Sequence, residues 1–162
     1  MTLEVQCPDA ALDRLNRLPS LDPALVRDAF SMIRDIGGAS RVVNAWGAAL
    51  NIPQLIGGLL FIATIEGQLV LATLILTLVV AGQIHKRTPF SRLIGLCHLP
   101  WLALLPWLVY RLQTAEHSIA LQIWGWYVAV VIAISLVFDA IDVYRYAEGE
   151  KTFSWASSQA FG

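Results

Sequence analysis

The chain has 162 residues, of which 57% are hydrophobic and only 14% are charged, and its formal net charge is −1. A soluble domain carries about 25% charged residues, so most of this chain is expected to contact lipid rather than water. The near-neutral balance, without a block of basic residues, excludes nucleic acid as an expected partner.

Residues 1–41 are expected to form a cytoplasmic N-terminal region with an amphipathic helix over residues 23–36. Asp22 is suited to cap this helix, Pro23 suits its first turn, and two glycines follow its end. Apolar residues at helical spacing share one face, while arginines and aspartates lie off it. The helix is predicted either to lie on the membrane surface or against the protein's own loops, or to dock on a partner.

The apolar stretch from Val42 to Ile84 holds a single ionisable residue, Glu66, and is too long for one span. One interpretation is a single long helix from Pro53 to Ile84. It places Glu66 near mid-membrane, where an acid is a candidate proton or cation site. The other interpretation is a break near Glu66. It gives helices over about 42–64 and 67–84 and puts the acid in an outer turn.

The distribution of positive charge favours the break at Glu66. Short cytoplasmic loops carry an excess of Lys and Arg. With four spans, the arginines before the first span, the basic loop 85–92 and the C-terminal tail all fall on one side of the membrane. The Glu66 turn has no Lys or Arg and the loop 111–118 has only Arg111, as expected for the outer side. We therefore predict that both chain ends are cytoplasmic.

The third and fourth spans are expected over about 93–112 and 119–144, which completes a four-helix bundle over residues 42–146. Pro100 and Pro106 predict kinks in the third span. A short loop joins the two spans, so they should be antiparallel neighbours. A polar cytoplasmic tail is expected over residues 147–162.

A polar cluster is predicted at the cytoplasmic ends of these two helices. His98 and Asp139 lie at similar depths, so we expect them to approach each other. Asp142 and Arg145 follow on the same stripe, and Arg92 is available as a cationic partner for the acids. The cluster is interpreted either as a structural polar zipper, as a proton-relay, metal or ligand site, or as a contact with a partner subunit. The three histidines do not show spacings typical of metal sites, so neither a metal nor a cofactor is expected.

The sequence thus predicts an all-α integral membrane protein with four transmembrane helices and an N-terminal amphipathic helix, in a bacterial cytoplasmic membrane. Small size and the amphipathic arm favour a non-catalytic accessory or assembly subunit of a larger membrane complex. Its partners would be the lipid bilayer and other membrane subunits or further copies of itself. The alternatives are a small oligomeric transporter or channel, favoured by the double-proline helix, and a membrane enzyme with a cytoplasm-side His/Asp/Arg site acting on lipid or quinone.

Overall fold

The computed structural model describes residues 23–153 of the chain, and within that range the protein is all-helical, as predicted. The predicted lead before residue 23 and the tail beyond residue 153 lie outside the described residues. The helices are α2 (Pro23–Ala39), α3 (Arg41–Leu60), α4 (Ile65–Arg87), the 3₁₀ helix η1 (Arg92–His98), α5 (Trp101–Thr114) and α6 (Ile119–Ala147).

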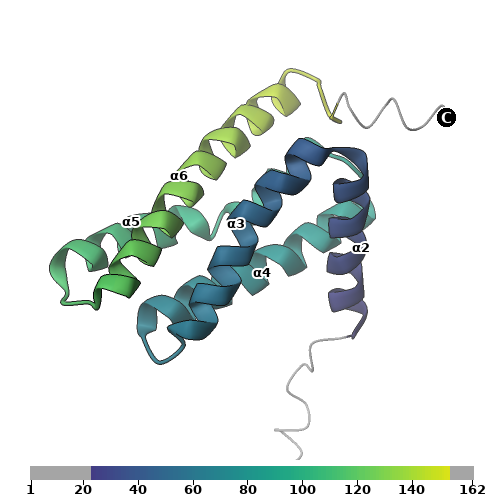
Figure 1. Cartoon of the computed structure of the whole chain (residues 1–162). Helices are drawn as coiled ribbons and strands as arrows, with labels where there is room; N and C mark the ends of the chain where they lie inside the picture. The colour runs from purple at the N-terminus through teal and green to yellow at the C-terminus, as the bar shows by residue number, and fades with distance from the viewer. Residues whose placement is uncertain (1–22, 154–162) are drawn as a thin grey trace, which may run out of the picture.

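The helices pack as two hairpins, α3 with α4 and η1–α5 with α6 (Figure 1). Helix α3 also contacts α6, and α5 also contacts α4, so the hairpins close into a bundle. The turns between α3 and α4 and between α5 and α6 lie together at one end, here named the loop end. Helix α2 packs across α4 and α3 at the opposite end, here named the α2 end, where α6 also finishes.

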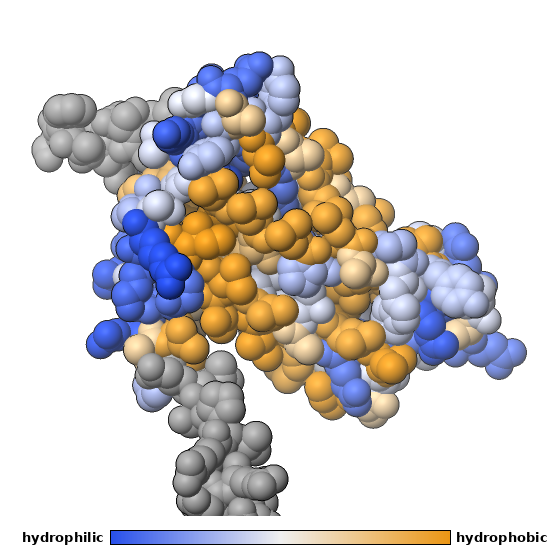
Figure 2. Space-filling model, turned by 180° about the vertical axis from the view of Figure 1, so that it is seen from behind, coloured by the Kyte–Doolittle hydropathy of each residue, from blue (hydrophilic) through white to orange (hydrophobic). Residues whose placement is uncertain are grey.

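Two helices, α4 with 23 residues and α6 with 29, are long and apolar enough to cross a membrane. The η1 and α5 helices make a third candidate span if they are counted as one, and they are bent by 41° to each other. Large hydrophobic side chains stay exposed along the bundle. Figure 2 shows them as a broad apolar surface flanked by hydrophilic ends. A broad apolar surface of this kind is unusual for a soluble monomer, and together with the long apolar helices it indicates association with a membrane.

The core lies between α5 and α6 and includes residues of α3 and α4. Trp101, Leu108, Val128, Ile132 and Val70 are fully buried in it. A second, smaller cluster joins α2 to the bundle and contains Met32, Ala81 and Cys97. Helix α2 is therefore held on the bundle by apolar contacts of its own.

One aromatic donor of α6, Tyr127, compensates for the proline inside α3, and a second, Trp124, binds α3 one turn further along. Because Pro53 has no N–H, the carbonyl of Ala49 loses its helical partner. The Tyr127 hydroxyl donates to that carbonyl at 2.7 Å, and Trp124 Nε1 donates to the carbonyl of Pro53 at 2.9 Å. Gly57 makes room for this indole, since a Cβ at Gly57 would lie 1.9 Å from its Nε1.

The third predicted helix, over about 93–112, is two helices rather than one. A 3₁₀ segment ends at His98, and α5 begins at Trp101 after Leu99 and Pro100. The break falls where Pro100 cannot donate a backbone hydrogen bond. The second proline of the pair, Pro106, stays inside α5.

The break between the first two spans also differs from the predicted position. Thr64 caps α4, with its side chain accepting from the N–H of Gly67, and the turn occupies residues 61–64. Glu66 consequently lies in the first turn of α4 and is only 2% exposed. It is neither in a solvated turn nor near the middle of one long helix.

Candidate functional site

The structure brings His98 and Asp139 into direct contact at the α2 end of the bundle. Nδ1 of His98 lies 2.7 Å from Oδ2 of Asp139, and each side chain is 18% exposed. The imidazole packs on the buried indole of Trp101, with 4.1 Å between ring centroids. Gly95 allows the close approach, because a Cβ there would lie 2.8 Å from Oδ1 of Asp139.

Arg92, at the other end of η1, is the second contact between η1 and α6. Its guanidinium donates to Asp142 through Nη1 and to Glu150 through Nη2. The same guanidinium lies 5.0 Å from the ring centroid of Phe153. Only 5% of Arg92 is exposed, so this charge is held inside the protein by two carboxylates. Arg145, which the sequence grouped with these residues, is exposed in the last turn of α6.

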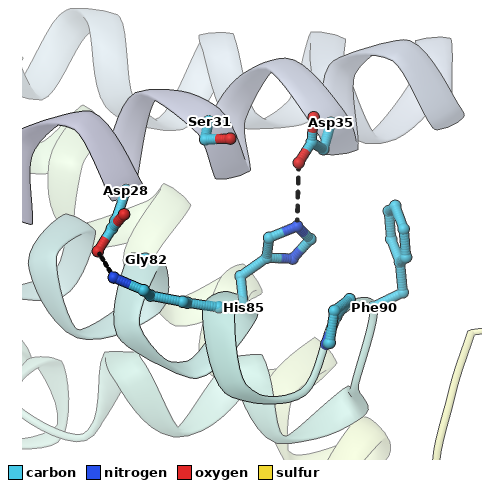
Figure 3. Close-up of a pocket in the computed structure, with 8 residues that line it drawn as sticks. Asp28, Ser31, Asp35, Gly82, His85 and Phe90 are labelled. Atoms are coloured by element: carbon cyan, nitrogen blue, oxygen red, sulfur yellow. Dashed lines mark hydrogen bonds and ion pairs between the residues drawn. The ribbon is translucent and has the colours of Figure 1, made fainter.

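A third set of ion pairs fastens α2 to α4 (Figure 3). Lys86 Nζ donates to Oδ2 of Asp28 at 2.8 Å, and the Gln83 amide donates to the same oxygen at 3.2 Å. Hydrogen bonds from Lys86, and then from Gln83, lower the pKa of Asp28 below its ordinary value. About two turns further along α2, Oδ2 of Asp35 lies 3.4 Å from Nε2 of His85.

Sequence reasoning missed these α2 pairs. The sequence indicated no partner for the acids of α2, whereas Asp28 pairs with Lys86 and Asp35 lies beside His85, both at the end of α4. The signal was present in the spacing of Asp28 and Asp35, which are seven residues apart and so share a face of the helix. Nothing in the sequence indicated which element that face would meet.

An open pocket of about 390 Å³ lies between α2 and α4 beside these pairs (Figure 3). Asp28, Asp35 and His85 line it together with Phe90, whose ring meets the imidazole edge-on at 5.2 Å. Phe90 has a φ of 56°, an uncommon conformation for a residue other than glycine. Nδ1 of His85 is buried and has no hydrogen-bond partner within residues 23–153.

At the loop end, Glu66 forms a buried ion pair with Arg111. The Nε and Nη2 atoms of Arg111 each lie 2.8 Å from Oε1 of Glu66. Nε2 of His117 lies 3.8 Å from the same oxygen and 3.1 Å from the backbone oxygen of Arg111. The carboxylate is also in the first turn of α4, where the helix dipole favours negative charge.

Each of the three histidines in the chain therefore lies beside a carboxylate: His85 with Asp35, His98 with Asp139 and His117 with Glu66. Every one of these contacts joins different elements, so the polar side chains connect helices. The geometry thus suits the fastening of separate elements to one another.

The interior between the two ends contains further polar groups. Gln54, Thr77 and Trp101 bury side-chain polar atoms without a hydrogen-bond partner in the part of the chain that the structure describes. A buried polar group without a partner costs about 1–3 kcal/mol, so such groups call for water or a bound group. Over residues 23–153, no set of three or more His, Cys, Asp or Glu residues is arranged to hold a metal ion.

Comparison of the chain with protein-family models, with curated proteins and with solved structures finds no match.

Proposed function

We propose that this protein is a non-catalytic accessory or assembly subunit of a larger membrane complex, with four spans in a bacterial cytoplasmic membrane and both ends in the cytoplasm. In this arrangement α3, α4, the η1–α5 unit and α6 cross the bilayer. Among residues 23–153, Arg111 is the only Lys or Arg at the loop end, and the others lie at the α2 end. That asymmetry supports a cytoplasmic α2 end.

The outward face of α3 supports the proposal that the protein binds another membrane subunit. Its half nearest the α2 end exposes Ala45 and Ala49, four residues apart, with the larger Val42 and Ile52 exposed beside them. Small residues at this spacing let a second helix approach closely, and they offer little packing to lipid chains. The occupant that fits this face is a transmembrane helix of another subunit.

The polar contacts support a structural role for the bundle itself. At each end, charged groups join separate elements of the chain, through Glu66 and Arg111 at one end and through Arg92 and Asp142 at the other. A shift in helix register would leave the buried charge of Glu66 or Arg92 away from its partner, so these pairs disfavour other registers. A bundle held in this way presents its outer faces in a constant geometry.

Native mass spectrometry after gentle detergent extraction tests the proposal. We expect a particle that contains this chain and other membrane subunits in a constant ratio. A particle that contains only this chain, as a monomer or a homo-oligomer, would contradict the accessory role.

Two matched substitutions test the α3 face. Ala45 on α3 and Ala103 on α5 are both exposed in the isolated chain, so replacing either with leucine should leave the fold intact. Ala45→Leu is expected to lower recovery of the other subunits several-fold, because the larger side chain separates the two helices. Ala103→Leu should not change the recovery. If the other subunits are recovered equally well with both variants, this face of α3 is not the surface that contacts them.

A second candidate function is a small oligomeric transporter, and the break between η1 and α5 favours it. Broken helices in transporters place binding groups where the helix is interrupted. Here His98, paired with Asp139, ends η1 directly before the break. Proteoliposomes loaded with a pH-sensitive dye test this: proton flux that requires Asp139 supports transport, and flux equal to that of empty liposomes contradicts it.

A further inference from the structure

Helix α2 uses only part of its apolar surface to pack on the bundle. Ala29 and Met32 are buried against the bundle. The backbone of Ala29 passes close to Gly82, because a Cβ added at Gly82 would lie 2.9 Å from the Ala29 nitrogen. The adjoining strip of the helix is apolar but exposed. Val26, Phe30 and Ile33 are 42%, 68% and 44% exposed.

Two arginines border this exposed strip. Arg27 follows Val26, and Arg34 follows Ile33, so the two arginines are seven residues apart and lie on one side of the helix. At 1.5 Å per residue, their Cα atoms are separated by roughly 10 Å along the axis. Both line a shallow groove of about 540 Å³, together with Asp28, Phe30 and Ser31.

The acids near the groove do not cancel the positive charge of the arginines. The carboxylate of Asp28 faces α4 and binds Lys86 there (Figure 3). Asp35 likewise turns toward His85. Arg34 Nε lies 3.9 Å from Asp35 Oδ1, a contact between exposed groups that contributes little. The two guanidinium groups therefore remain available to an anion.

From these observations we propose that α2 binds the headgroup of an anionic phospholipid. Arg27 and Arg34 contact its phosphate, while Val26, Phe30 and Ile33 enter the boundary between headgroups and acyl chains. The geometry is that of an interfacial helix, with an apolar strip on the lipid side and arginines at the headgroup level. This inference rests on the proposed cytoplasmic location of the α2 end, but it does not depend on the proposed role as an accessory subunit.

The position of α2 in the molecule is consistent with this ligand. It lies at the end of the bundle that carries the basic residues, where a hydrophilic cluster borders the apolar surface (Figure 2). The cytoplasmic leaflet is the anionic one, and each nearby Lys or Arg adds about 1 kcal/mol of attraction to it. The apolar strip beside the arginines distinguishes a lipid from a free phosphate, because only the lipid offers acyl chains to cover it.

Lipid binding by the full-length chain in detergent measures the arginine contribution. Native mass spectrometry with equal amounts of phosphatidylglycerol and phosphatidylcholine should show preferential retention of phosphatidylglycerol. Replacing both Arg27 and Arg34 with Gln should weaken that binding roughly 30-fold, from about 1 kcal/mol for each arginine. The matched control replaces Arg87 and Arg145, which are exposed at the same end but outside α2. It removes the same charge and should change binding less than 3-fold.

Photocrosslinking identifies what covers the apolar strip. A benzophenone-bearing phenylalanine analogue in place of Phe30 should yield a mass increase of one phospholipid in phosphatidylglycerol vesicles. An adduct with another protein instead of lipid would overturn the proposal. The proposal would also be overturned if the Arg87 and Arg145 control lost as much binding as the α2 variant. Displacement of the lipid by millimolar inorganic phosphate would overturn it too, because it would indicate a site for a free anion.

Discussion

Nδ1 of His98 and Oδ2 of Asp139 lie 2.7 Å apart and join segments 41 residues distant in the chain. Arg92 and His98 are the first and last residues of η1, and both bind acids of α6. A 3₁₀ helix has weaker internal hydrogen bonds than an α-helix, so this segment depends on contacts outside itself. The ion pair of Arg92 and the contact of His98 with Asp139 hold η1 at both ends against α6.

Replacing Asp139 with alanine should release one end of η1. A hydrogen bond to a charged group contributes about 1.5–3 kcal/mol, so we expect a loss of stability of about 2 kcal/mol. Hydrogen exchange over residues 92–98 should become faster, because that segment loses one of its two anchors. Thermal unfolding in detergent measures the first effect, and exchange detected by mass spectrometry measures the second.

Two variants separate this local effect from a general loss of acidic charge. Asp139→Asn keeps a hydrogen-bond acceptor and should have a smaller effect than Asp139→Ala. Glu116, which is exposed in the loop between α5 and α6, provides the control, and its replacement by alanine should leave η1 unchanged. Unchanged exchange over residues 92–98 in Asp139→Ala would show that the pair does not hold η1.

The approach of His98 to Asp139 is the part of the site that sequence reasoning could anticipate. Both residues interrupt long apolar stretches, and a short loop makes their helices antiparallel neighbours, so counting residues from the helix ends gives their depth. The break before Trp101 could not be placed in this way. A proline within an apolar helix is compatible with a kink, as at Pro106, or with a full interruption, as at Pro100.

The environment of Glu66 depends on contacts that local sequence does not report. The helix begins at Ile65, directly before Glu66 rather than after it, because Thr64 caps it, and this moves the carboxylate from the turn into the bundle. Its partner Arg111 is 45 residues away. The pairing of Asp28 with Lys86, which are 58 residues apart, likewise joins distant parts of the chain and is not indicated by local sequence. Amphipathicity predicted helix α2, but the element it meets is determined by tertiary packing.

Gly57→Ala tests the contact between α3 and α6. The added Cβ would lie 1.9 Å from Trp124 Nε1, so the indole must move and its hydrogen bond to the carbonyl of Pro53 must lengthen. Overpacking of this kind costs about 1–3 kcal/mol. We expect lower thermal stability and an altered near-ultraviolet circular dichroism signal from the tryptophan.

Gly38→Ala is the matched control for Gly57→Ala. Gly38 is also helical, but a Cβ there meets nothing within 4 Å. Alanine is a better helix former than glycine, so this variant should be neutral or slightly more stable. Equal destabilisation by the two substitutions would mean that the effect of Gly57→Ala does not arise from the indole contact.

The pairing of the buried Glu66 with Arg111, whose side chain is 36% exposed, predicts non-additive substitutions. Arg111→Gln leaves the Glu66 carboxylate without its main partner and should cost roughly 1–2 kcal/mol, less than for a fully buried pair because water already reaches the arginine. Adding Glu66→Gln to that variant removes the unpaired charge and should restore part of the loss. A double-mutant cycle by denaturant unfolding in micelles checks this, and additive effects would show that the two groups do not interact.

The attachment of α2 to α4 should weaken in acid. Hydrogen bonds from Lys86, and then from Gln83, lower the pKa of Asp28 in the folded protein. Undocked α2 therefore binds the proton more readily than docked α2. The stabilisation is complete above the ordinary aspartate pKa of about 4, and it is lost as the pH falls through the lower folded-state value.

Hydrogen exchange over residues 23–39, corrected for the intrinsic pH dependence, should accelerate in that window. Asp28→Asn removes the titrating group, so its exchange should already be faster at neutral pH and depend less on acid. An acid dependence equal to that of the native chain would assign the effect to another group.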